Sequence, residues 1–187
     1  MVGGDERAGM STRAQRDEEF RAFVRSSSGS LSRTAWFLTG DADVAADLVQ
    51  EAYARAYASW GRVRRADALA YVRKILVNAN VDRWRRVRHE VVADDVDRAA
   101  DGDIADGFSA GGFETGVDER DRVARMLALL PRRQRAVVVL RYADDLSEQA
   151  VADHLGISVG AVKSAASRGL AALRVSVSTS DLEREWR

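Results

Sequence analysis

The stretch Ser147–Arg174 constrains the fold most, because it predicts two helices joined by a tight turn. Ser147 is a suitable N-cap, apolar residues follow it four positions apart, and Gly156 ends the first helix. Ser158 is the N-cap of the second helix. The apolar residues of that helix recur every three or four positions and predict its buried face: Val159, Val162, Ala166, Leu170 and Leu173.

The opposite face of the second helix combines small side chains with hydrogen-bond donors. It carries Ala161, Ser164 and Arg168, with Gly160, Ala165 and Ser167 beside them and Lys163 on the flank. Small residues let a helix approach a duplex closely, and the donors can reach bases and phosphates. The pattern predicts a helix-turn-helix whose second helix lies in the DNA major groove. An ordinary helical hairpin with a small-residue surface is the alternative that these residues leave open.

The segment before this unit also favours nucleic acid. Pro131, the only proline, suits the first turn of a helix over Arg132–Tyr142. Three arginines at the start of that helix oppose its dipole: Arg132, Arg133 and Arg135. We therefore expect them to face a phosphate backbone.

Composition indicates a globular helical protein. The 187 residues are 46% hydrophobic and 31% charged, and 14 glycines with one proline favour helix over sheet. The absence of cysteine excludes disulfides, and two isolated histidines, His89 and His154, do not make a metal site. There is no apolar run near the length of a membrane span and no secretion leader. We expect a cytoplasmic protein without metal or cofactor.

The formal net charge of zero hides two opposite blocks. Nine basic residues stand against two acidic ones over Arg62–Arg88, and eleven acidic residues stand against two basic ones over Glu90–Asp121. Because the charges of the two blocks cancel, the net charge of zero does not argue against a nucleic-acid partner.

The chain divides into two helical domains. Residues 1–16 predict a disordered arm, 17–88 a first domain, 89–120 a flexible acidic linker, 121–175 a second domain and 176–187 a polar tail. In the first domain we expect a short helix around Phe20–Val24, a break at Ser26–Ser30, and helices over Leu31–Thr39, Val44–Trp60 and Ala66–Arg88. The fold class is therefore all-α.

Two surfaces of the first domain stand out. Helix Val44–Trp60 carries an outward polar row of Asp47, Gln50, Glu51 and Arg55, a pattern that is usually a solvated face. The end of helix Ala66–Arg88 surrounds Trp84 with Arg83, Arg85, Arg86, Arg88, Asn78 and Asn80. Arginines interleaved with an aromatic ring can stack on unpaired bases and hold a backbone, which predicts single-strand capture. The alternative is that Trp84 only caps the core.

Four motifs in order resemble the bacterial extracytoplasmic-function sigma factors of the sigma-70 family, with wording closest to the actinobacterial SigE-like group. They are Asp-Leu-Val-Gln-Glu-Ala, Val-Asn-Ala-Asn-Val-Asp-Arg-Trp-Arg-Arg, Leu-Pro-Arg-Arg-Gln-Arg-Ala-Val-Val-Val-Leu-Arg-Tyr and Gly-Ile-Ser-Val-Gly-Ala-Val-Lys-Ser, with an acidic linker after the second. The resemblance covers about Asp17–Arg88 and Asp121–Arg174.

The resemblance implies a sigma factor that binds core RNA polymerase and directs promoter recognition, melting and transcription initiation. Region 2 would be 17–88 and region 4 would be 121–175. The core contact would fall on Asp47, Gln50, Glu51 and Arg55. The minus-ten element would meet Arg62, Arg64, Arg65, Arg73, Asn78, Asn80, Arg83, Trp84, Arg85 and Arg86. The minus-thirty-five element would meet Arg141, Ser158, Gly160, Ala161, Lys163, Ser164 and Arg168.

The same resemblance names the partners: core RNA polymerase, promoter DNA and, as a candidate, an anti-sigma factor, with no small-molecule substrate and no catalytic activity. Ala161 and Ala165 depart from the threonine and arginine common in the family, which implies fewer base contacts upstream. Two other function classes compete. One is an ordinary helix-turn-helix transcriptional regulator. The other is a helical enzyme, which the absence of a Gly-rich phosphate loop and of a Gly-x-Ser-x-Gly motif disfavours.

Overall fold

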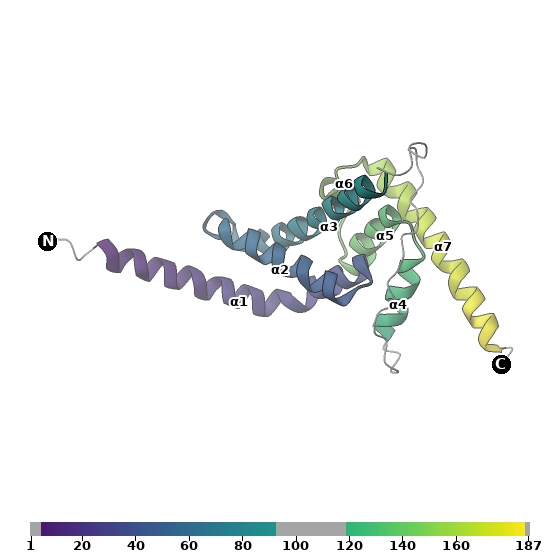
Figure 1. The fold of residues 1–187 in the computed structure, drawn as a ribbon, viewed down its shortest axis with the longest axis horizontal. Helices are drawn as coiled ribbons and strands as arrows, with labels where there is room; N and C mark the ends of the chain where they lie inside the picture. Colours follow the sequence, from purple (N-terminus) through teal and green to yellow (C-terminus); the bar gives the residue numbers. More distant parts are fainter. Residues whose placement is uncertain (1–4, 93–118, 186–187) are drawn as a thin grey trace.

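The computed structural model describes the backbone of residues 5–92 and 119–185, with side chains described over 13–86 and 121–176. Every regular element in these ranges is helical, as predicted (Figure 1). The first half contains α1 (Asp5–Thr39), α2 (Ala42–Ala58), two 3₁₀ turns (Trp60–Arg62 and Arg65–Asp67) and α3 (Ala68–Val92). The second half contains α4 (Glu119–Ala128), α5 (Arg132–Val138), the π-helical turn η3 (Val139–Ala143), α6 (Glu148–Leu155) and α7 (Val159–Glu185).

Helix α1 is continuous where the sequence predicted an arm and a break. It runs from Asp5 to Thr39, so residues 5–16 are helical and the serines at 26–30 do not interrupt it. Ser26 Oγ and Ser27 Oγ both donate to the carbonyl of Phe23, at 2.9 and 2.7 Å. Hydroxyls that bond one turn back let serine and threonine stay inside a helix, and this local satisfaction explains the wrong prediction.

Capping fixes the start of α2. Gly40 has φ 67°, the left-handed conformation expected after a helix, and the Asp41 carboxylate accepts from the Val44 amide at 3.0 Å. Helices α1, α2 and α3 then pack together around fully buried side chains that include Leu31, Leu38, Leu48, Val72 and Leu76.

Five aromatic rings join the middle of α1 to the end of α2 and the 3₁₀ turn after it: Phe20, Phe23, Tyr53, Tyr57 and Trp60. Their closest centroids lie 4.9 Å apart, between Trp60 and each of the two phenylalanines. The Arg65 guanidinium lies 4.3 Å from the Trp60 ring centroid and donates to the Trp60 carbonyl at 3.0 Å. The rings bury a large apolar area, and the arginine attaches the basic loop that follows α2 to this cluster.

The helix-turn-helix forms as predicted. Ser147 Oγ accepts from the Ala150 amide at 3.1 Å, Gly156 ends α6 with φ 64°, and Ser158 Oγ accepts from the Ala161 amide at 3.2 Å. Helix α7 does not stop near Arg174, however. It continues to Glu185, so most of the segment predicted as a polar tail is helical (Figure 1, yellow).

Gly169 sets how closely α7 approaches α5. A Cβ at this position would lie 2.7 Å from Val138 Cγ2, closer than packed atoms allow, and Val138 is buried. We expect Gly169→Ala to lower the free energy of unfolding by about 1–3 kcal/mol through overpacking. Gly160→Ala is the matched control in the same helix, because its Cβ would meet only Ser158 Oγ at 3.9 Å. Urea unfolding of both variants measures the difference, and equal stability would contradict a close contact at Gly169.

Arg135 is buried, contrary to the expectation that it faces a phosphate backbone. Its guanidinium donates to the carbonyls of Leu127 and Ala128 at 2.9 Å and of Leu130 at 3.2 Å. It also donates at 3.2 Å to the carbonyl of Leu38, near the end of α1. Arg135 therefore closes the turn before α5 and ties it to the first half of the chain.

The two halves contact each other directly. Helix α1 packs against α4, α5 and η3, and α3 packs against α6 (Figure 1). The predicted flexible linker, 89–120, lies largely outside the described residues. We keep the division into two domains, 17–88 and 121–175, as a proposal. The structure shows in addition that the two halves are in contact.

Candidate polymerase and nucleic-acid interfaces

The outward row of α2 lies on the surface. Asp47, Gln50 and Arg55 are exposed and Glu51 is half-buried. Glu51 and Arg55 form an ion pair of 2.6 Å one helical turn apart. An exposed pair of this kind contributes little to stability. The row is therefore available for a partner at small cost to the fold.

Most of the residues expected to meet the minus-ten element are also exposed. They are Arg62, Arg64, Arg65, Asn78, Arg83, Arg85 and Arg86. Trp84 is partly buried against the hydrophobic core, so the core-capping alternative describes part of its surroundings. Arg65 also has a structural role, since it forms an ion pair with Glu19 and donates to the carbonyl of Val63 at 3.1 Å. No local sequence pattern indicates this contact, because Glu19 and Arg65 are 46 positions apart.

Arg73 and Asn80 differ from the rest of this set because they are buried. Arg73 Nε lies 3.2 Å from Asp144 Oδ2, and the two side chains are 9% and 1% exposed. Asn80 Nδ2 is buried without a hydrogen-bond partner. Both residues are expected to meet the minus-ten element, and in this arrangement both side chains are covered.

The Asp144 side chain is buried, although its polar surroundings in the sequence predict a solvated carboxylate. It follows η3, and its carboxylate accepts from Thr34 Oγ1 at 2.8 and 3.0 Å besides pairing with Arg73. Burial raises the pKa of Asp144 above its ordinary value, and the nearby Arg73 and the Thr34 hydrogen bond oppose this shift. No local pattern could reveal the contact, because Thr34 and Asp144 are 110 positions apart.

The second helix of the helix-turn-helix presents the predicted face. Ser158, Lys163, Ser164 and Arg168 are exposed, as is Gly160, and Ala161 is half-buried. Lys163 Nζ lies 3.6 Å from Glu148 Oε2, which holds it beside α6. Ala165 is buried with Val162 and Ala166, so it belongs to the core and not beside the DNA face. The packing around position 165 explains why a short side chain stands at this position.

Arg141 is partly buried at the edge of this face. It donates to the carbonyl of Leu146, and its guanidinium lies 5.6 Å from the Tyr142 ring centroid. These contacts hold the turn before α6. Arg141 thus has a local structural partner in addition to the upstream contact expected for it.

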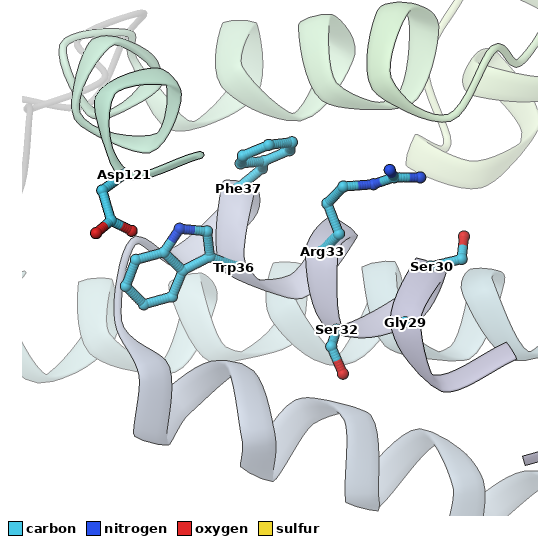
Figure 2. Close-up of a pocket in the computed structure, with 7 residues that line it drawn as sticks. All are labelled: Gly29, Ser30, Ser32, Arg33, Trp36, Phe37 and Asp121. Carbon is cyan, nitrogen blue, oxygen red and sulfur yellow. The ribbon is translucent and has the colours of Figure 1, made fainter. Parts of the chain in front are cut away.

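A hollow of about 610 Å³ lies between α1 and α4. Figure 2 shows Trp36 next to the Asp121 carboxylate, with the Arg33 guanidinium directed away from both. None of the expected site residues lines it. Among the described residues there is no cluster that could hold a metal ion, and none of the described helices is long and apolar enough to cross a membrane.

Each half of the chain matches a known protein family. Residues 23–90 match the family described as sigma-70 region 2, and residues 120–173 match sigma-70 region 4. The chain is 34% identical to the RNA polymerase sigma-E factor of Streptomyces coelicolor, covering 88% of this chain and 89% of the relative. It is 30% identical to the extracytoplasmic-function sigma factor SigW of Bacillus subtilis, covering 73% and 77%.

Solved structures agree on the fold. The sigma factor RpoE of Bartonella quintana, in complex with the anti-sigma factor NepR, superposes with a TM-score of 0.64 at 22% identity over 84% of this chain and 95% of that one. CnrH, in complex with the cytosolic domain of CnrY, gives 0.60 at 22% identity over 89% and 94%. With two matched regions in order and a relative that is 34% identical over 88% of the chain, the chain belongs to the sigma-70 family as an extracytoplasmic-function sigma factor.

Proposed function

We propose that this sigma factor docks on core RNA polymerase through the outward row of α2, engages the minus-ten element with the basic end of α3, and reads the minus-thirty-five element with α7. The observation that carries the proposal is the order of a region 2 match and a region 4 match on one chain. Promoter recognition then needs no catalytic group, cofactor or small-molecule substrate in this chain. The place of action is the cytoplasm, where the polymerase is.

The chemistry of the two DNA surfaces supports different tasks. The basic end of α3 carries Arg83, Arg85 and Arg86 around the partly exposed ring of Trp84. Guanidinium groups beside an aromatic ring suit unpaired bases and their backbone. Helix α7 presents small and donor side chains along one exposed face, which suits a duplex major groove.

An anti-sigma factor is part of the proposal as a regulator. Two solved structures that share this fold are RpoE with the anti-sigma factor NepR and CnrH with the cytosolic domain of CnrY. The fold of this chain resembles both, so it offers the same kind of helical surface to an inhibitor. Release from such a partner would precede polymerase binding.

The test is reconstitution with purified core polymerase. The protein should bind core stoichiometrically and start transcription at a defined site on promoter DNA. Asp47→Arg should weaken core affinity by about tenfold without unfolding the protein, since exposed substitutions cost little stability. Affinity is measured by titrating labelled protein with core.

Asp153→Arg is the matched control, because it makes the same charge change at an exposed position on α6. It should leave core affinity unchanged. Equal affinity of Asp47→Arg and the parent protein would contradict docking through α2. Duplex binding without any core binding would instead favour the ordinary DNA-binding regulator.

A further inference from the structure

The loop between α2 and α3 carries three arginines that differ in exposure and in partners. Arg62 and Arg64 are exposed, and the side chain of Arg64 is 85% exposed with its Nε 3.7 Å from the Asp67 carboxylate. The side chain of Arg65 is 48% exposed and makes four hydrogen bonds within the chain. The partners of Arg65 therefore set it apart from the other two arginines.

The Arg65 guanidinium joins two parts of the loop backbone. Its Nη1 donates to the carbonyls of Trp60 at 3.0 Å and Val63 at 3.1 Å. Trp60 begins a 3₁₀ turn, and Val63 is the extended residue that follows this turn. A planar guanidinium can span both carbonyls while it stacks on the indole, which a lysine ammonium cannot do. Because Arg62 and Arg64 stand on this backbone, Arg65 fixes how their side chains are directed.

Helix α1 holds the other side of the guanidinium. Glu19 Oε2 accepts from Arg65 Nε at 3.2 Å and also from Nη2. Two positions earlier, Asp17 Oδ1 accepts from the hydroxyl of Tyr57, near the end of α2. Both carboxylates precede residue 23, where the match to sigma-70 region 2 begins. The loop is therefore attached to a segment of α1 that comes before the matched region.

The contact between Glu19 and Arg65 orients the loop more than it stabilises the fold. The two side chains are 42% and 48% exposed, and an exposed ion pair contributes little to stability. The core of the first half consists instead of buried apolar side chains such as Leu48 and Leu76. Loss of the contact should therefore loosen the loop locally while the three helices stay folded.

We propose that Arg65 is a positioning residue, held by Glu19, that sets the loop so that Arg62 and Arg64 face promoter DNA. Its own guanidinium is engaged within the protein. The proposal rests on the proposed function, because the minus-ten element is expected to meet Arg62 and Arg64. It gives a role in DNA binding to Glu19, an acidic residue that cannot itself attract a polyanion.

The sign of the Glu19 effect separates positioning from direct contact. If Arg65 contacted phosphate, Glu19→Gln would free the guanidinium and remove a negative charge, so DNA binding would tighten. If Arg65 positions the loop, the same substitution weakens DNA binding although no cation is removed. Arg65→Lys adds a second contrast, since lysine keeps a phosphate contact but lacks the fork that spans two carbonyls.

The test measures DNA binding and loop opening separately. The full chain bound to core polymerase is titrated, at several salt concentrations, with a duplex unpaired over the minus-ten element of a promoter mapped with this protein. Limited trypsin digestion of the full chain, read by mass spectrometry, reports how readily the loop opens for cleavage after Arg62 and Arg64. Glu19→Gln and Arg65→Lys both keep these cleavage sites.

Glu18→Gln is the matched control. It makes the same charge change at the neighbouring position of α1, where Glu18 pairs with Arg21 and Arg25 on its own helix. It should change neither loop cleavage nor DNA binding.

The expected result in both Glu19→Gln and Arg65→Lys is faster cleavage in the loop and weaker DNA binding. Affinity should fall by about fivefold, the size of one weakened surface contact, and the salt-dependence slope should decrease as Arg62 and Arg64 lose phosphates. The urea midpoint of Glu19→Gln should stay at that of the parent protein, because the pair is exposed. A general loss of structure would move this midpoint and would not lower the slope alone.

Tighter or unchanged DNA binding by Glu19→Gln would overturn the positioning role, and Arg65 would then be a direct contact. Unchanged loop cleavage in both variants would overturn the attachment of the loop to α1. Arg83→Ala separates these failures from that of the proposed function, because Arg83 lies near the far end of α3. If Arg83→Ala weakens binding and Glu19→Gln does not, the proposed DNA surface stands and positioning fails. If Arg62→Ala, Arg64→Ala and Arg83→Ala all bind as the parent does, the proposed DNA surface itself fails.

Discussion

Replacing Arg135 by methionine should lower the free energy of unfolding by about 3 kcal/mol. The guanidinium is buried and donates to four backbone carbonyls: two at the end of α4, one in the turn before α5 and one at the end of α1. Methionine fills similar space but donates nothing, so these carbonyls would lose their charged partner in a buried region. The loss should appear in urea unfolding followed by circular dichroism.

Arg122→Met is the matched control, because it removes an exposed arginine from α4. It should change stability by less than about 0.5 kcal/mol. Arg135→Lys should fall in between, since an ammonium keeps the charge but lacks the planar fork that reaches several carbonyls. A stability of Arg135→Met equal to that of Arg122→Met would show that the carbonyls find other partners.

The elements that local chemistry determines were predictable from the sequence. The helix-turn-helix is specified within a few residues by the Ser147 cap, the left-handed Gly156 and the Ser158 cap. The exposed row on α2 and the exposed basic end of α3 follow from helical periodicity in the same way. Each of these signals acts over one or two helical turns.

The contacts between the halves were not predictable by such reasoning. Arg135 looked like a phosphate ligand because its only visible context was two neighbouring arginines, while its partners include Leu38, 97 positions away. The polar neighbours of Asp144 likewise predict a solvated carboxylate, while its partner Thr34 is 110 positions away. Ala165 is predicted to lie beside the DNA face, but its small side chain packs in the core. Burial of a polar or small residue depends on which distant helix covers it.

The recognition helix α7 carries two cationic side chains, Arg168 and Lys163, and we predict different roles for them in DNA binding. Arg168→Ala should relax sequence preference in the upstream element and cost about 1–3 kcal/mol on the matched duplex, as expected for loss of a bidentate base contact. Lys163 lies beside α6 next to Glu148 and can reach a phosphate. Lys163→Ala should weaken binding to all sequences alike and reduce the salt-dependence slope by about one, because it removes one released counterion.

The measurement uses the full chain bound to core polymerase, titrated with duplexes that carry either the upstream element of a promoter mapped with this protein or a scrambled one. Several salt concentrations give the slope for each variant. Ser167→Ala, at an exposed position between the two helix faces, is the control for changes in the helix itself. If Arg168→Ala lost affinity equally for both duplexes, Arg168 would be a second phosphate contact, and sequence preference upstream would then depend on Ser164 and on duplex shape.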